Sequence, residues 1–258
     1  MNGTAPVLTT RPNTSRGFEC FLMSLLILPS DSESGGQNMA ADWWLFHEAQ
    51  ELGAPVFRHY GWTEKTTSFG YGQDWHWVRE KVGESTETLV RRPTGGGIVR
   101  HGGDWTYCLV LPRGHKSFSM SALDLSEKIH QAMGESLLEQ GFYSSLKPCP
   151  EARQKGIPGD CFLEPVARDL MSKNGEEKIA GAAMKRSRCG ILVQGTMNLL
   201  LPIAFEPEKF RSCFLRQIST ILEESPEEIA WPKNFEEGRR KFVKQFTSLA
   251  WNRERTPF

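Results

Sequence analysis

Three consecutive glycines, Gly95 to Gly97, separate two segments that otherwise have the composition of β-strands. Glycine loses more backbone entropy on ordering than any other residue, so a run of three is unfavourable inside a packed element. Such a run is useful where the backbone lies against a small ligand, because its N–H groups can then bind an anionic or carbonyl group. The run predicts two strands bent around a binding loop, with a plain hairpin turn as the alternative.

Two arginines precede these glycines and would add positive charge beside a ligand. Side chains alternate along an extended segment, so only one of the two can face the ligand. We place Arg92 on the ligand side and Arg91 on the other. Thr94 and His101 flank the glycines and are further candidate contacts, although His101 could equally be a structural histidine.

Length and charge limit the class of protein. The chain has 258 residues, with 31 Lys and Arg against 31 Asp and Glu. This length suits one large domain, and the balanced charge gives no reason to expect a nucleic-acid or anionic membrane partner. No apolar run approaches the roughly 18–20 residues that a membrane span needs. We expect no nucleic-acid partner and no membrane association.

The cysteines are scattered and form no C-x-x-C pair. Neither a metal site nor a disulfide framework is therefore expected, and a reducing cytoplasm is the simpler location. One of these thiols could still be catalytic. The six are Cys20, Cys108, Cys149, Cys161, Cys189 and Cys213.

The first residues are interpreted separately from the domain. Residues 1–22 are predicted to be a disordered or mis-assigned extension, with Met23 as an alternative start. The apolar segment 18–29 superficially resembles a signal-peptide core, but its charged region is weak and no cleavage pattern is clear. We expect residues 24–28 to form the first strand of a single domain over 23–258, with an export signal as the alternative.

Hydrophobic periodicity and turn signals predict an α+β fold, a mixed sheet covered by helices. Asn38 is the predicted N-cap of the first helix and Gly53 its end, while Gly61 marks a turn. Helices are expected at 38–52, at 120–140 and over most of a C-terminal segment, 205–258, including 205–210, 214–222, 226–230 and 234–251. Strands are expected at 55–60, 66–71, 88–92, 98–100, 105–111, 162–171, 179–184 and 191–200.

Four blocks in matching order resemble the lipoate/biotin–protein ligase superfamily. The glycine segment RRPTGGGIVRH is similar to its acyl-binding loop, and KIAGAA, beginning at Lys178, is similar to its lysine motif. Asn38-Met39-Ala40-x-Asp42 resembles its first-helix motif, and Gln194-Gly195-Thr196 occupies the place of its H-G-[TS] segment. The resemblance covers about residues 24–201 and implies the fold of the ligase catalytic domain.

Three further segments resemble the branch of cysteine-type octanoyltransferases. They are FRHYGW at 57–62 followed by SFGYGQ at 68–73, DWTY at 104–107, and CFLEP at 161–165. Two positions depart from that branch. Gly97 stands where it often has arginine, and Gln194 replaces a histidine, so that a side chain unable to carry a proton stands there. An internal-amidotransferase relative with a similar cysteine is a further alternative.

The resemblance implies that Cys161 is the nucleophile and holds an octanoyl group as a thioester, while Lys178 contacts the acyl carbonyl. Cys161 follows a turn signal at 158–160, and Lys178 could return beside it through a polar turn. The competing interpretations are a buried apolar thiol and a surface lysine. The expected acyl- or substrate-binding residues are Arg92, Thr94, Gly95, Gly96, Gly97, His101, Tyr107, Gly181, Ala182, Gln194 and Gly195.

This interpretation implies octanoyl-acyl carrier protein as donor and a lysine of a lipoyl domain or glycine-cleavage H protein as acceptor, without a cofactor. Asp42 would either orient a basic group or belong to the first turn of its helix. An ATP-dependent lipoate–protein ligase, using ATP and Mg²⁺ with Cys161 as a bystander, is the main alternative. A non-catalytic subunit that binds acylated proteins is a third, suggested by Gln194.

Overall fold

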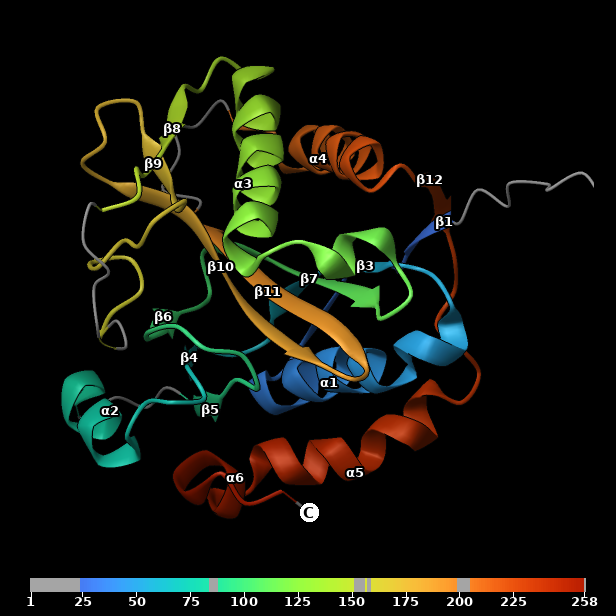
Figure 1. The fold of residues 1–258 in the computed structure, drawn as a ribbon. Coiled ribbons are helices and arrows are strands. Elements are labelled where there is room, and N and C mark those ends of the chain that lie inside the picture. Colours follow the sequence, from blue (N-terminus) through green and yellow to red (C-terminus); the bar gives the residue numbers. More distant parts are fainter. Residues whose placement is uncertain (1–23, 84–87, 151–155, 157–158, 199–204, 258) are drawn as a thin grey trace, which may run out of the picture.

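The computed structural model describes residues 24–83, 88–150, 156, 159–198 and 205–257. Within them, a nine-stranded mixed sheet lies between two layers of helices (Figure 1). The predicted α+β fold is confirmed. The predictions made for residues 1–22 lie outside the described residues. None of the helices in the described ranges combines the length and apolar character needed to cross a bilayer.

The large sheet is mostly antiparallel. Its strands are β1 (Ser24–Ile27), β2 (Asp31–Glu33), β3 (Val56–Trp62), β7 (Asp104–Pro112), β8 (Ser144–Leu146), β9 (Leu170–Ser172), β10 (Lys178–Ser187), β11 (Gly190–Asn198) and β12 (Ser225–Glu228). They follow the order β12-β1-β3-β7-β11-β10-β9-β8, and β2 pairs with β3. Only the β12–β1, β1–β3 and β2–β3 pairs within this described sheet are parallel.

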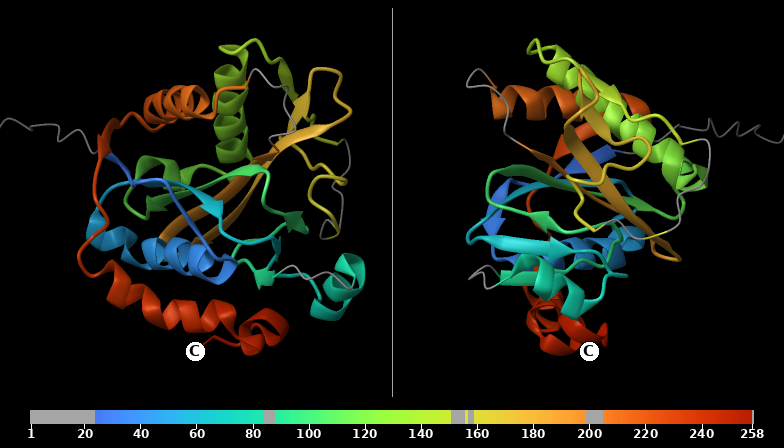
Figure 2. Two further views of the ribbon diagram at one scale, coloured as in Figure 1. Left: turned by 180° about the vertical axis from the view of Figure 1, so that it is seen from behind. Right: turned by 90° about the vertical axis from the view of Figure 1, so that its left-hand side faces the viewer.

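Six α-helices form in the described ranges of the chain. They are α1 (Gly35–Leu52), α2 (Trp75–Val82), α3 (Ala122–Leu138), α4 (Pro207–Leu222), α5 (Phe235–Thr247) and α6 (Leu249–Glu254). Helices α3 and α4 lie over one face, and α1 lies on the opposite face with α5 outside it (Figures 1 and 2). A short 3₁₀ helix, Lys116–Ser119, follows β7.

The central strand β7 is buried on both faces, which explains its continuous apolar run. Trp105, Tyr107 and Leu109 enter the core beneath α3 and α4. Cys108 and Val110 enter the core beneath α1 and α5. The strand predicted at 105–111 is confirmed. Its two neighbours, β3 and β11, each contribute residues to the candidate site.

Helix α1 begins before the predicted N-cap. Ser34 precedes it with extended backbone, so the prediction of Asn38 as the cap is wrong. The Asn38 amide instead donates hydrogen bonds to the carbonyls of Glu33 (3.1 Å) and Gly61 (2.9 Å), and so joins α1 to β3. Gly53 ends the helix with a φ of 67°, as expected for a left-handed C-cap.

A second sheet carries the glycine segment. It has the order β5-β4-β6, with β4 (Thr66–Phe69), β5 (Thr88–Arg91) and β6 (Val99–Arg100). The segments 88–92 and 98–100 were expected to pair with each other, but each pairs with β4 instead. Helix α2 follows β4 and was not predicted. The turn expected at Gly61 is also wrong, because β3 continues through this residue.

Two predictions in the second half of the chain are wrong. The strand expected at 162–171 is reduced to β9, because Asp160 binds the N–H of Phe162 with its side chain and starts a turn. Residues 226–230 were assigned to the helical tail. Instead β12 pairs in parallel with β1 at the edge of the sheet, a place that tolerates the missing N–H of Pro226.

Candidate active site

The glycine loop, residues 92–98, is folded around the guanidinium of Arg92. Nη2 of Arg92 donates hydrogen bonds to the carbonyls of Gly95 (3.0 Å) and Gly97 (2.7 Å). Gly96 has a φ of 86°, in the left-handed region that glycine adopts most readily. Gly70 packs directly against the loop, since a Cβ there would lie 2.0 Å from the carbonyl oxygen of Gly96. The glycines therefore allow both the turn and the close approach of two backbones.

The two arginines point in opposite directions. Nε of Arg91 donates to the carbonyl of Asn252 in α6 (2.9 Å), and its Nη1 donates to three carbonyls after β4. Arg92 points the other way, and its Nη1 donates to Oγ of Ser68 (2.6 Å). In the described part of the chain no carboxylate pairs with Arg92, and burial lowers its pKa.

Cys161 lies in a turn that rests on the glycine loop. Its N–H donates to the carbonyl of Ile98 (2.9 Å), and Asp160 forms a parallel bridge with Ile98. Asp160 Oδ1 then accepts the N–H of Phe162 at 3.0 Å. The sulfur is thus presented by a turn, and no strand follows it directly.

Lys178, the first residue of β10, is held between a carboxylate and this sulfur. Its Nζ lies 2.7 Å from Oδ2 of Asp169 and donates to Sγ of Cys161 at 3.2 Å. Both side chains of the Lys178–Asp169 pair are almost fully buried. Gly181 makes room for it, because a Cβ there would lie 2.5 Å from Nζ. Nζ of Lys178 therefore faces the nucleophilic atom of Cys161 directly.

A cavity of about 590 Å³, including its open mouth, lies between the glycine loop, the Cys161 turn and strands β4, β10 and β11. Both predicted catalytic residues line it. The predicted site residues in its wall are Arg92, Gly96, His101, Cys161, Lys178, Gly181, Ala182, Gln194 and Gly195.

Four predicted binding residues do not line this cavity: Thr94, Gly95, Gly97 and Tyr107. Tyr107 belongs to the core beneath α3 and α4, and burial raises the pKa of its phenol. Gly195 allows this ring to pack against β11, since a Cβ on Gly195 would lie 2.3 Å from it. These residues shape the wall from behind.

His101 joins a hydrogen-bonded chain at the edge of the cavity. Its Nδ1 lies 2.7 Å from Oδ2 of Asp104, and its Nε2 lies 2.6 Å from Oγ of Ser68. Asp104 also accepts the hydroxyl protons of Thr106 and Thr196. Burial would raise the pKa of Asp104, but bonds from His101 and the threonines lower it to about 2. Burial lowers the pKa of His101, although Asp104 opposes this.

Gln194 connects the glycine loop to α1. Its Oε1 accepts the hydroxyl proton of Thr94 (2.8 Å), and its Nε2 donates to Oδ2 of Asp42 (2.8 Å). Asp42 pairs with Arg58 at 3.0 Å and accepts the Tyr60 hydroxyl at 2.8 Å. Burial raises the pKa of Asp42, and Arg58 opposes that effect. Of the two roles considered for Asp42, orienting a basic group is the one observed.

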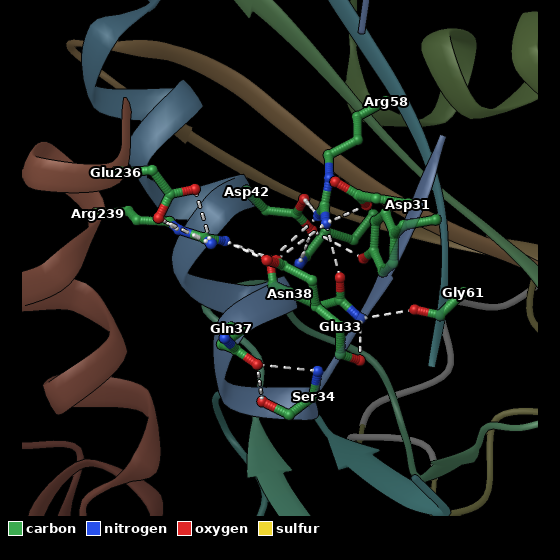
Figure 3. A network of polar contacts seen from close by, with 12 residues as sticks. Asp31, Glu33, Ser34, Gln37, Asn38, Asp42, Arg58, Gly61, Glu236 and Arg239 are labelled. Atoms are coloured by element: carbon green, nitrogen blue, oxygen red, sulfur yellow. Dashed lines mark hydrogen bonds and ion pairs between the residues drawn. The ribbon is translucent and has the colours of Figure 1, made fainter. Parts of the chain in front are cut away.

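Arg58 is the centre of a larger buried network that fixes α1 (Figure 3). Its guanidinium also reaches Asp31 (2.9 Å) and the side-chain oxygen of Asn38 (2.7 Å). Glu33, 3.6 Å from Arg58, binds Arg239 of α5 at 2.6 Å. The network therefore holds the helix that carries Asp42 in place relative to β2, β3 and α5.

Several cavity residues were not predicted from the sequence. Ser68 lies in the quoted SFGYGQ segment, which was the available signal for it. Asp169 carries no local signal, because its importance comes only from contact with Lys178. Across the described ranges, no group of three or more His, Cys, Asp or Glu side chains is arranged to hold a metal ion.

Comparison with known proteins places this geometry in a family. The family model of the lipoyl protein ligase A/B catalytic domain matches residues 34–234. The chain belongs to this family. The resemblance inferred from the sequence motifs is therefore confirmed, and the matched region contains both Cys161 and Lys178.

Octanoyltransferases are among the similar sequences of this family. Octanoyltransferase LipM of Staphylococcus aureus (strain NCTC 8325 / PS 47) is 33% identical over 150 residues, 55% of this chain and 54% of that protein. Octanoyltransferase LipM of Oceanobacillus iheyensis is 28% identical over 240 residues, 86% of this chain and 84% of that protein. The match thus spans about half of the first relative's length and most of the second's.

Solved structures show the same fold. The bi-partite lipoate protein ligase of Thermoplasma acidophilum superposes with a TM-score of 0.67 at 20% identity. The superposition covers 92% of this chain and 98% of that chain. The predicted fold of the ligase catalytic domain is thus observed over nearly the whole chain.

Proposed function

We propose that this chain is an octanoyltransferase of protein lipoylation, working through a thioester on Cys161. The observation that carries the proposal is the 3.2 Å contact between Sγ of Cys161 and Nζ of Lys178 inside the cavity. The proposal is also supported by sequence similarity to the octanoyltransferases of Staphylococcus aureus and Oceanobacillus iheyensis. The donor would be an octanoyl-acyl carrier protein, and the acceptor a lysine of a lipoyl domain or glycine-cleavage H protein.

In the first half-reaction, the thiolate of Cys161 attacks the carbonyl carbon of the octanoyl thioester. A new carbon–sulfur bond forms, the donor's carbon–sulfur bond breaks, and the carrier's thiolate leaves with the electron pair. Lys178 stabilises the attacking thiolate, while Asp169 keeps the ammonium in place at 2.7 Å. The positive charge of Arg92 lies in the same cavity wall and favours the oxyanion that develops.

The acyl chain requires an apolar wall. The cavity supplies one from Met39, Val99, Val166 and Ala183. Ala183 and Gly96 face each other, since a Cβ on Gly96 would lie 3.6 Å from the Ala183 methyl group. A side chain at position 96 would therefore lie in contact with β10.

In the second half-reaction, the amine of the acceptor lysine attacks the Cys161 thioester. The amide bond forms, the carbon–sulfur bond of the enzyme breaks, and the electron pair of that bond returns to Sγ of Cys161 beside Lys178. The T. acidophilum ligase was studied with its E2 lipoyl domain, which makes a lipoyl domain a suitable first acceptor to test. No nucleotide is needed, because the donor thioester already carries an activated acyl group.

The test is intact mass measurement after incubation with octanoyl-acyl carrier protein without nucleotide. We expect an octanoyl adduct on the wild-type chain and none on Cys161→Ser, whose transfer rate to a lipoyl domain should fall about a thousandfold or more. Cys189→Ser is the matched control, since Cys189 is also half-buried but lies outside the cavity wall. It should form the adduct at the wild-type rate.

Two other results would replace the proposal. ATP- and Mg²⁺-dependent attachment of free lipoate, unaffected by Cys161→Ser, would identify a lipoate–protein ligase. Binding of octanoylated proteins without an adduct and without either reaction would identify a non-catalytic subunit.

A further inference from the structure

A chain of four polar groups along the cavity has its hydrogen bonds all running in one direction. Asp104, with a pKa of about 2, is a carboxylate at neutral pH and so accepts the Nδ1–H of His101. The lone pair of Nε2 then faces Oγ of Ser68, and the Ser68 hydroxyl is the donor. Nη1 of Arg92 donates to the same hydroxyl oxygen at 2.6 Å. The order Arg92 to Ser68 to His101 to Asp104 therefore leads a proton away from the cavity.

The other acidic groups in the cavity wall are already engaged. Asp169 is paired with the Lys178 ammonium. Glu164 accepts the backbone N–H of Gly159 at 3.1 Å, which stabilises the turn. Among the described residues that line the cavity, the imidazole of His101 is the neutral base with a lone pair directed at a cavity hydroxyl.

The second half-reaction needs such a base. A lysine side chain has an ordinary pKa of about 10.4, so the acceptor arrives as an ammonium with no lone pair for attack. Lys178 does not serve, because its Nζ already donates to Oδ2 of Asp169 at 2.7 Å and to Sγ of Cys161 at 3.2 Å. Arg92 cannot either, because a guanidinium has no acceptor atom.

We propose that Ser68 removes a proton from the ammonium of the acceptor lysine while passing its own proton to Nε2 of His101, which Asp104 orients. This role rests on the proposed transferase function. It makes Ser68 the catalytic group that touches the acceptor, and it makes His101 and Asp104 positioning residues that act through Ser68.

The step balances. The ammonium loses one proton to Oγ of Ser68, and the Ser68 proton moves to Nε2, giving imidazolium. The neutral amine attacks the thioester carbon, and the carbon–sulfur bond breaks with its electron pair on Sγ of Cys161. The second proton of the attacking nitrogen goes to that sulfur as the amide forms. The imidazolium then releases its proton to water, so that one proton is released per amide.

The surroundings of His101 suit a temporary proton acceptor. Asp104 on β7 stabilises the imidazolium, and the ring stacks on Trp62 of β3 at 3.9 Å, a face that favours a cation. Arg92, the other charged group that affects it, opposes protonation, and burial keeps the pKa of His101 low. The ring is therefore neutral before the acceptor arrives and returns its proton readily afterwards.

The experiment separates the two half-reactions in full-length variants. Ser68→Ala, His101→Gln and Asp104→Asn are loaded from octanoyl-acyl carrier protein, and the adduct is followed by intact mass. The loaded enzyme is then mixed with a lipoyl domain. We expect the transfer rate to fall about 100- to 10,000-fold more than the loading rate, as for loss of a general base. His115→Gln is the matched control, a buried histidine paired with Glu224 at 3.2 Å outside the cavity.

A nucleophile that is already neutral shows whether a variant has lost proton removal or has only misplaced the thioester. Hydroxylamine is largely neutral at pH 7, so it should cleave the octanoyl adduct of the variants at nearly the wild-type rate. The slow transfer to the lipoyl domain should also speed up as pH rises, because free amine becomes available without the relay. The wild-type rate should level off at lower pH.

Three results would overturn the relay. Transfer at the wild-type rate in Ser68→Ala and His101→Gln excludes it while leaving the transferase intact. Equal slowing with hydroxylamine and with the lipoyl domain would show a structural role for these residues. Absence of any adduct on the wild-type chain would refute the transferase itself, and the relay with it.

Discussion

At the residue scale, the absence of a side chain at Gly181 decides where the Lys178 ammonium lies. A Cβ on Gly181 would lie 2.5 Å from Nζ of Lys178 and 3.0 Å from Oδ1 of Asp169. From the sequence, Gly181 was expected to bind the acyl group or substrate. The structure shows that Gly181 accommodates the protein's own ion pair, in which Nζ also reaches Cys161.

Gly181→Ala should therefore displace Nζ from Sγ of Cys161. Moving one catalytic group by about 1 Å can cost 100-fold, so we expect adduct formation to slow about 10- to 100-fold. The rate of octanoyl-adduct formation measures this effect. Gly114→Ala is the control, because a Cβ there meets nothing within 4 Å. Equal rates for the two variants would show that the position of Nζ does not limit the reaction.

Individual residues also show why some parts of the site could be predicted from the sequence and others could not. Alternation along an extended segment correctly separated the directions of Arg91 and Arg92. Contact between Cys161 and Lys178 was expected from the motifs and is observed at 3.2 Å. Asp169 was missed because its contact with Lys178 exists only after β9 and β10 have paired.

At the element scale, the sequence predicted the bounds of a helix or strand correctly where residues within or next to that element determine them. Gly53 ends α1 through its own backbone conformation, and this was predicted. Strand β12 was missed because it forms by pairing with β1, which is remote in sequence. The predicted strand at 162–171 failed because Asp160 binds nearby N–H groups with its side chain, an alternative that periodicity does not show.

Helix α6 supports the strand that leads into the glycine loop, and this contact can be tested. Oδ1 of Asn252 accepts the Arg91 N–H at 2.7 Å, and the Trp251 indole donates to the Arg91 carbonyl at 2.9 Å. Asn252→Ala leaves a buried donor without its partner, so the free energy of unfolding should fall by about 1–3 kcal/mol. Urea unfolding measures it. The exposed Asn234, whose side chain makes no capping bond, is the control as Asn234→Ala, and an equal loss there would contradict the prediction.

At the scale of the whole molecule, buried histidines make stability depend on pH. Burial lowers the pKa of these side chains below the ordinary 6.5, so the unfolded chain binds protons that the folded chain does not. Their contribution to the free energy of unfolding is complete above pH 6.5 and is lost progressively as the pH falls from 6.5 through their lower pKa in the folded chain. Asp42 and Glu224 act in the opposite direction, because burial raises their pKa. The histidines concerned are the half-buried or buried His59, His101, His115 and His130.

His59 defines the pH window of this effect. Burial, with the nearby Arg211 and Arg58, lowers its pKa to about 4, and its ring stacks on Trp105 at 4.8 Å. The free energy of unfolding should therefore decrease as pH falls from 6.5 to 4, with His59 contributing up to one proton to the slope. Urea unfolding in half-unit pH steps measures this slope for the wild type and for His59→Gln. The variant should lose less stability across the window, because glutamine binds no proton. Parallel curves for the two proteins would show that His59 is protonated alike in the folded and unfolded chains.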